Sequence, residues 1–545
     1  MFVTEKMDHI SGLPKIILHN ILSKLPTKDA ARTSILSKEW RETWLMFPIL
    51  DFCDTLVMGG PPCDEKFLGK KDIFFDYVKK TLQRFCDRGL AIKKFKLTLN
   101  CLDFEDLSHQ HLDLWLKLAC ESGVKIVEVY LSDAEDIGQW YIFPPSLLEA
   151  KSLNKLVLMG GIKIDLEFLN HSNRFFSLQE LSWWSVLLQD EREFERFISR
   201  CPLIEHITLK CCYVYKPPTI WDQQVSWTSP LNSIRMRGLQ KLKVFDVQGL
   251  QEVYIDAPNL ESLCFVPNSR DVPYKLDFDS CRNLRLLHLY SWNSTVLSDK
   301  WFIELFSKFP FLESLKFQNC SISESINISN AQLKVLVFSN CCNLKEVNID
   351  APNLISCGFF GSPCRRVVSF LSCSSQLEVN VALSINYKDL LDLREFIKDL
   401  KPRNVLSSLS LFVFNQYTDE PKPYVLQPLS PLPHIKHLDL RTVPEDEAFF
   451  FPLLNCLFSI CCPETISLFL RRQFCTKPFA EFLYETLMGR KQGECHCSSG
   501  NECWWHGVKN VKVTCELNLD ENLDFKTMLD ALPAAGENLF FSLEL

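Results

Sequence analysis

The chain has 545 residues, of which 47% are hydrophobic, and its formal net charge at pH 7 is -8. This composition supports a large buried core, and the length predicts two to four domains or one long repeat array with additions. The 59 basic and 67 acidic residues form no long run of one sign, so we expect neither a disordered chain nor a nucleic-acid-binding protein.

The N-terminus, MFVTEKMDHI, has no apolar core of the kind that a signal peptide needs. The longest uncharged apolar run, Ala448 to Pro463, contains Pro452 and Asn455 and is short for a membrane span, so we interpret it as protein core. We therefore expect a cytoplasmic or nuclear protein with no membrane span. In that setting its 24 cysteines stay reduced and mostly act as small buried side chains.

Residues 10–47 predict three short helices. Pro14 suits the first turn of a helix, where its missing N–H needs no partner, and Thr27 and Ser37 are candidate caps for two further helices. The first helix carries two neighbouring apolar rows, and the third adds two tryptophans. These side chains are Leu13, Ile17, Ile21 and Leu25 in one row, Leu18 and Leu22 in the other, and Trp40 and Trp44. A module this small cannot bury them all, so another protein or the next domain must cover some of them. Either row could face inward.

This segment closely resembles the F-box. The resemblance rests on the LP pair at Leu13–Pro14, the ILxxLP stretch ending at Pro26, the AAR turn, and the SILSKEWRxxW run from Ser34 to Trp44. It implies docking on the Skp-type adaptor of a cullin-RING ubiquitin ligase. The positions that would face the adaptor are Leu13, Pro14, Ile17, Ile21, Leu25, Leu36 and Trp40. The alternative is that these residues only cap the repeats that follow.

Beyond Leu50 the chain repeats the pattern apolar-x-x-apolar-x-apolar, which is typical of the short strands of a leucine-rich array. Its spacing is irregular. The matches are Leu153/Leu156/Leu158, Ile204/Ile207/Leu209, Leu239/Leu242/Val244, Leu284/Leu287/Leu289, Leu312/Leu315/Phe317, Leu333/Leu336/Phe338 and Leu406/Leu409/Leu411. Cys212, Cys320 and Cys341 each follow three residues after such a pattern, where a small side chain suits an inward turn.

Two internal alignments define the repeat unit. Residues 190–212 align with 298–320, and both segments predict a helix, a proline and then a strand. Residues 250–265 align with 344–359, where the DAPN tetrapeptides leave room for a turn but for no helix. Stacked units of this kind predict a parallel sheet with one open, concave face that holds other macromolecules.

Residues 421–433 contain five prolines, which predict a loop or hinge. The strand pattern returns at Ile435/Leu438/Leu440, and a helix is expected from Phe479 to Met488. Residues 440–545 resemble the FBD-like C-terminal segment of plant F-box/leucine-rich-repeat proteins, where a Cys-Trp-x-His tract precedes a strand. We therefore predict an α/β fold in three parts: an F-box of three helices (1–50), an irregular leucine-rich-repeat solenoid (51–420), and the last repeat with a small α+β C-terminal region (421–545).

A weak candidate metal site lies in the C-terminal region at Cys495, Cys497, Cys503 and His506. Sulfur and imidazole are zinc ligands, but the spacing C-x-C-x5-C-x2-H is not that of a paired zinc knuckle. An ordinary hairpin loop is the simpler interpretation, and we predict no metal and no cofactor.

The sequence shows no catalytic constellation. It contains 18 glycines but neither a G-x-G-x-x-G nor a P-loop element, and its 11 histidines are scattered. Two hypotheses follow. In the first, the chain is the non-catalytic receptor of a ubiquitin ligase, with the F-box on the adaptor and the repeats on the target. In the second, it is a leucine-rich scaffold or sensor without a role in degradation.

Overall fold

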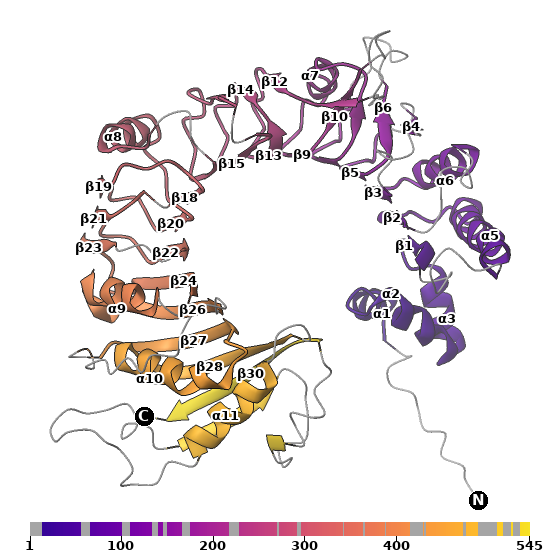
Figure 1. Ribbon diagram of the computed structural model, residues 1–545. Coiled ribbons are helices and arrows are strands. Elements are labelled where there is room, and N and C mark those ends of the chain that lie inside the picture. Colours follow the sequence, from indigo (N-terminus) through magenta and orange to yellow (C-terminus); the bar gives the residue numbers. More distant parts are fainter. Residues whose placement is uncertain are drawn as a thin grey trace, which may run out of the picture. The chain divides into compact units, whose positions relative to one another are not determined.

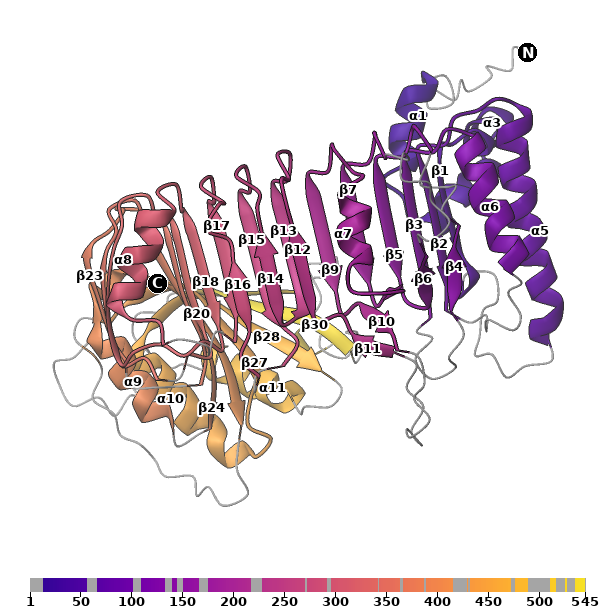
Figure 2. The same ribbon diagram turned by 90° about the horizontal axis from the view of Figure 1, so that it is seen from above.

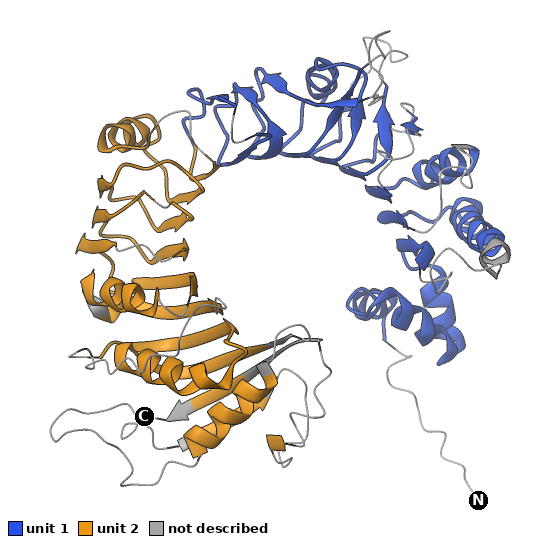
Figure 3. Cartoon of the chain, in the orientation of Figure 1, with its two compact units in different colours: residues 1–283 blue, residues 284–545 orange. Residues whose placement is uncertain are grey.

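The computed structural model describes residues 13–55, 66–100, 109–132, 140–144, 150–165, 175–216, 228–269, 272–291, 296–341, 343–362, 366–386, 389–414, 429, 432–471, 476–488, 510–515, 525–526 and 535–544. The chain divides into two compact units, residues 1–283 and 284–545, which are described separately below (Figure 3). No helix in the described part of the chain combines the length and apolar character needed to cross a bilayer.

Unit 1 begins with a helical module. Its elements are α1 (Lys15–Leu22), α2 (Thr27–Arg32), the 3-10 turn η1 (Thr33–Ile35) and α3 (Lys38–Leu45). Ser37 caps α3 as predicted, because its Oγ accepts a hydrogen bond of 3.2 Å from Trp40 N. The predicted cap at Thr27 is wrong: Pro26 precedes α2 and no side chain caps it, since the Thr27 hydroxyl is bonded to Asp51 instead.

A parallel sheet runs through the rest of unit 1. Strands β1 and β2 pair first, and β3, β5, β7, β9, β13 and β15 follow in that order. Their bounds are β1 (Ile49–Cys53), β2 (Lys94–Leu99), β3 (Ile126–Leu131), β5 (Lys155–Met159), β7 (Glu180–Trp184), β9 (His206–Lys210), β13 (Val244–Leu250) and β15 (Ser262–Pro267). Figure 2 shows these strands side by side. Side chains alternate between a buried face and an open face, as the two-residue period of a strand requires.

A second layer covers the buried face of this sheet (Figure 1). It consists of helices and of short outer strands in two small sheets, β4-β6-β8-β10-β11 and β12-β14-β16. The helices are α5 (Lys66–Asp87), α6 (His109–Glu121) and α7 (Glu193–Ile198). The outer strands are β4 (Tyr141–Phe143), β6 (Ile162–Ile164), β8 (Leu187–Leu188), β10 (Tyr213–Tyr215), β11 (Thr228–Pro230), β12 (Ser233–Met236), β14 (Glu252–Ile255) and β16 (Lys275–Asp277).

Unit 2 has the same two layers. Its parallel strands are β17 (Leu286–Tyr290), β18 (Ser314–Gln318), β20 (Val335–Ser339), β22 (Ser356–Gly361), β24 (Glu378–Asn386), β26 (Leu406–Phe414), β27 (His434–Thr442) and β28 (Cys462–Arg471). Outer strands β19 (Ser325–Ser329), β21 (Glu346–Asp350), β23 (Val367–Ser372) and β25 (Leu400–Lys401) form a second parallel sheet. Between the layers, Phe317, Phe338 and Phe359 stack with successive ring centroids 5.8 Å apart.

The predicted internal alignments are confirmed. Strands β9 and β18 begin at residues 206 and 314, 108 residues apart, and each follows a helix, α7 or α8 (Asp299–Lys308). Strands β15 and β22 begin at residues 262 and 356, 94 residues apart, and turns rather than helices precede them. Helices therefore belong to only some of the repeat units, while short outer strands fill the second layer elsewhere.

One predicted strand pattern was placed in the wrong register. The sequence indicated Leu239/Leu242/Val244, but Val244 pairs with His206 at the open face, so the buried positions are Leu242, Phe245 and Val247. Two overlapping apolar patterns exist at this point in the chain. Only pairing with β9, where Ile207 and Leu209 are buried, decides between them.

The predicted structural role of the three cysteines agrees with their contacts. Cys212, Cys320 and Cys341 are buried, and each thiol lies within 3.4–3.8 Å of carbonyl oxygens on its own and the preceding strand. The residue before each cysteine has a positive φ: 47° at Cys211, 53° at Asn319 and 52° at Asn340. This left-handed residue turns the chain out of the strand, and the small thiol fills the inside of the turn.

The C-terminal region extends the sheet of unit 2. After β28 the chain returns as β30 (Ala535–Glu544), which pairs antiparallel with both β28 and β29 (Asn510–Cys515). Helices α9 (Leu390–Asp399), α10 (Phe450–Ile460) and α11 (Thr476–Met488) complete the unit, together with the 3-10 turns η4 (Arg403–Val405) and η5 (Glu447–Phe449). The apolar run at 448–463 is protein core as predicted, since most of α10 is buried. The predicted helix at 479–488 lies within α11.

Candidate functional site

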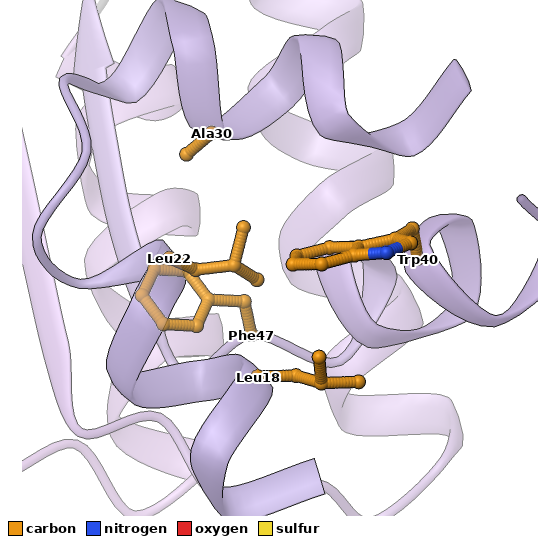
Figure 4. Close-up of a cluster of buried hydrophobic side chains, with 5 residues drawn as sticks. All are labelled: Leu18, Leu22, Ala30, Trp40 and Phe47. Atoms are coloured by element: carbon orange, nitrogen blue, oxygen red, sulfur yellow. The ribbon is translucent and has the colours of Figure 1, made fainter. Parts of the chain in front are cut away.

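The helical module of unit 1 has a complete small core of its own. Its buried side chains are Leu18, Leu22, Ala30, Trp40 and Phe47 (Figure 4). Ile21, Trp44 and Ile49 pack against this core while keeping part of their surface exposed. The inner row of α1 is therefore Leu18 and Leu22, which settles the question that the sequence left open.

The other apolar row of the module is exposed. Among the seven predicted surface positions, five are exposed: Leu13, Pro14, Ile17, Leu25 and Leu36. Ile21 is partly buried. Trp40 is only 4% exposed and belongs to the core, so it does not lie on the surface that the sequence assigned to it.

Two further exposed residues were missed by the sequence analysis. Ile35, at the end of η1, is 83% exposed, and Ile16 is also exposed on the first turn of α1. Ile35 stands directly before Leu36, so its place beside a predicted surface residue was the available signal. Together, Leu13, Ile16, Ile17, Leu25, Ile35 and Leu36 form what we call the exposed apolar set.

The helical module joins the repeat sheet directly. Pro48 lies between Phe47 of the module core and Ile49 of β1, and its carbonyl accepts hydrogen bonds from Lys93 N at 2.8 Å and Lys94 N at 3.2 Å. Tyr77 of α5 packs on Phe52 of β1, with ring centroids 5.6 Å apart, and burial raises the pKa of Tyr77. The module is therefore joined directly to the first strands of the array.

Ion pairs between neighbouring strands cover much of the open face of unit 1. Lys94 Nζ lies 2.8 Å from Glu128 Oε1, Lys155 Nζ 2.7 Å from Glu180 Oε2, and Lys210 Nζ 3.3 Å from Asp246 Oδ2. Each pair links two strands that are adjacent in the sheet. The face thus carries many charges with little net charge, which suits a protein partner better than a polyanion.

In unit 2, strands β27 and β28 bring a serine, a histidine and an aspartate together. Ser467 Oγ donates a 2.7 Å hydrogen bond to Asp439 Oδ1 and lies 3.0 Å from His437 Nε2. In a nucleophilic triad the serine would donate to the histidine and the aspartate would hold that histidine. Here the single hydroxyl proton points to the aspartate, and Arg441 pairs with the same carboxylate. The arrangement stabilises a buried carboxylate rather than activating a nucleophile.

The candidate zinc ligands Cys495, Cys497, Cys503 and His506 lie outside the described residues. Within the described part of the chain, no group of three or more His, Cys, Asp or Glu side chains is placed to hold a metal ion.

Comparison with known protein families identifies two domains. The F-box domain family matches residues 10–52, which include the helical module and the start of β1. The family described as At1g61320/AtMIF1, LRR domain, matches residues 86–275, which cover most of the sheet of unit 1.

Relatives in Arabidopsis thaliana combine the same domains. F-box/LRR-repeat protein 13 is 26% identical over 74% of this chain and 82% of its own length. An F-box/FBD/LRR-repeat protein is 24% identical over 74% of this chain and 83% of its own length. Other relatives are matched over only 51% of their length. Among solved structures, the TLR13–ssRNA13 complex covers 62% of this chain and 56% of its own, with 15% identity and a TM-score of 0.25. The fold assignment rests on strand pairing and the family matches.

Proposed function

We propose that this F-box/leucine-rich-repeat protein is the non-catalytic substrate receptor of an SCF-type cullin-RING ubiquitin ligase. The F-box binds a Skp-type adaptor, the repeats bind the protein to be ubiquitinated, and the complex works in the cytoplasm or nucleus. The rate increase comes from holding a target lysine close to the charged ubiquitin-conjugating enzyme, without a catalytic residue in this chain.

The exposed apolar set is the observation that carries this proposal. The module core is already filled, yet six large apolar side chains remain exposed on a body of about 35 residues. Covering a fully exposed side chain of this size contributes roughly 1.5–3 kcal/mol. The gain is smaller for members of the set that are already partly covered, such as Leu13 and Leu25, which are each 37% exposed. A second protein that covers this set is the simplest explanation, and the match to the F-box family supports a Skp-type adaptor as that protein.

The direct junction between module and repeats supports the same function. A receptor of this kind must keep the bound target at a defined distance from the ligase. The hydrogen bonds to the Pro48 carbonyl and the packing of α5 on β1 leave no linker between the two domains. The same feature would have little value in a scaffold with an unused F-box.

The proposal is tested by co-purification of the full-length chain with a Skp-type adaptor and cullin. Replacing Ile17 and Leu36 by aspartate should abolish adaptor recovery, because two buried carboxylates would then face an apolar partner surface. Ile142→Asp is the matched control, since Ile142 is also exposed but lies on outer strand β4. Equal adaptor recovery from the double variant and the control would rule out the proposed docking face.

A further inference from the structure

Three paired positions on the open face of unit 1 carry aromatic or apolar side chains among the ion pairs. Tyr130 on β3, Met159 on β5 and Trp184 on β7 occupy directly paired positions of three adjacent strands. The strands are about 4.8 Å apart, so the three side chains are neighbours. Met159 and Trp184 are each 37% exposed. We call these three residues the aromatic platform.

Contacts with neighbouring residues hold both rings of the platform in place. Trp184 Nε1 donates a 3.0 Å hydrogen bond to Ser182 Oγ, and Lys210 Nζ lies 4.7 Å from the centre of the indole. Tyr130 Oη donates to Glu128 Oε2 at 3.3 Å. Because these rings are already ordered, a partner that binds them loses little additional side-chain entropy. Ordered aromatic side chains are also frequent among the residues that contribute most to binding.

The charges around the platform limit the chemistry of its partner. Lys210 is paired with Asp246 and Lys96 with Asp51, at 3.3 and 3.4 Å, while Glu128 is paired with Lys94. A charged partner group would therefore compete with an existing pair and gain little. An uncharged apolar side chain would instead bury Met159 and the exposed edges of the rings. The surrounding ion pairs would form the polar rim that usually encloses such a contact.

We propose that the aromatic platform is the anchor point for the target protein, which places one uncharged apolar side chain on Met159 between Tyr130 and Trp184. This inference rests on the proposed receptor function for the identity of the partner as a substrate. It adds the chemical class of the recognised segment, namely an apolar residue in a stretch without charge. The platform lies on an open sheet face, where a polypeptide can cover a large area, rather than in a deep pocket suited to a small molecule.

The test is selection of a random peptide display library on the purified full-length protein, with adaptor binding measured in a separate assay. Peptides enriched on the wild-type protein should carry a Leu, Met, Phe or Trp flanked by uncharged residues. Their affinity, measured with the synthetic peptides, should fall about tenfold or more for Met159→Lys and Trp184→Ala. Ile142→Lys, on outer strand β4, is the control and should leave the affinity unchanged.

Several results would overturn this inference. These are the absence of enriched peptides, enrichment of charged motifs, or equal affinities for the platform variants and the control. A wild-type dimer that dissociates in Met159→Lys would identify a second copy of this chain as the occupant instead. Adaptor recovery is measured separately for the same variants. Loss of adaptor binding in the wild-type protein would count against the receptor function, whereas the peptide affinities test the platform.

Discussion

Thr27 and Asp51 connect the F-box to the repeat sheet. Thr27 Oγ1, at the start of α2, donates a 3.3 Å hydrogen bond to Asp51 Oδ2 on β1, and the same oxygen lies 3.4 Å from Lys96 Nζ on β2. One carboxylate therefore contacts both the helical module and the first two strands of the array. Thr27 does not cap α2 because it is the first residue of that helix and Pro26 occupies the cap position.

Removing this contact should loosen the junction without unfolding the module. We expect Thr27→Val to lower the free energy of unfolding by about 0.5–1.5 kcal/mol, the usual contribution of one hydrogen bond. Amide exchange in β1 should become faster. Thr33→Val is the control, because the Thr33 hydroxyl bonds only within the module, to Ala30 O. Similar β1 exchange in both variants would show that Thr27 has no role at the junction.

Substitutions in the core of the F-box should lower its stability, whereas substitutions on its surface should weaken adaptor binding. Trp40→Ala should destabilise the protein by about 3–5 kcal/mol, because it removes a large buried side chain. Leu36→Ala should change stability by no more than about 0.5 kcal/mol and should instead weaken adaptor binding. Chemical denaturation and an adaptor-binding titration measure the two effects. A stable Trp40→Ala protein would contradict the assignment of Trp40 to the core.

Gly160 is required by the turn that ends β5, directly after Met159. Its φ is +89°, and an added Cβ would lie 1.9 Å from the carbonyl oxygen of Leu131. Gly160→Ala should therefore cost about 2–3 kcal/mol or more. Gly89→Ala is the control: φ is +60°, but nothing lies within 4 Å of the added Cβ, so about 1 kcal/mol is expected. Thermal unfolding measures both variants. An equal drop in melting temperature for Gly160→Ala and Gly89→Ala would contradict the close approach of Gly160 to the Leu131 carbonyl.

Adjacent thiols should differ in reactivity. Burial raises the pKa of Cys212 from 9.0 to about 12, whereas Cys211 is exposed. At pH 8.5 an alkylating reagent should modify Cys211 in the native protein and leave Cys212 unmodified, because the thiolate is the reactive form. Peptide mass spectrometry distinguishes the two positions, and Cys211→Ser serves as the control. Rapid native modification of Cys212 would contradict its burial.

The raised thiol pKa also predicts the direction of the alkaline pH dependence. Below pH 9 the thiol of Cys212 is protonated in both the folded and unfolded states, so its contribution to stability is constant. From pH 9 toward 12 it ionises in the unfolded chain but stays protonated in the folded one. The folded state then binds more protons, so the free energy of unfolding should fall as the pH rises through this range. Cys212→Ala should reduce that slope in denaturant titrations.

The sequence alone was sufficient to predict the repeat unit and to recognise the F-box. The internal alignments at 108 and 94 residues placed β9, β18, β15 and β22 correctly, because a strand with one buried face needs apolar residues at alternate positions. The same rule misplaced Val244, where two apolar patterns overlap and either could form the buried face. Local pattern alone cannot choose between two registers of equal hydrophobicity.

What the sequence determined by itself was which side chains are apolar and how far apart they lie along the chain. The tertiary structure decided which of them are covered: on α1, Leu18 and Leu22 face inward and Ile17 remains exposed, because α3 and Phe47 pack on the side of α1 that carries Leu18 and Leu22. It also brought Tyr130, Met159 and Trp184 together. These residues lie far apart in the sequence, and only the hydrogen-bonded register between strands places them at the same level.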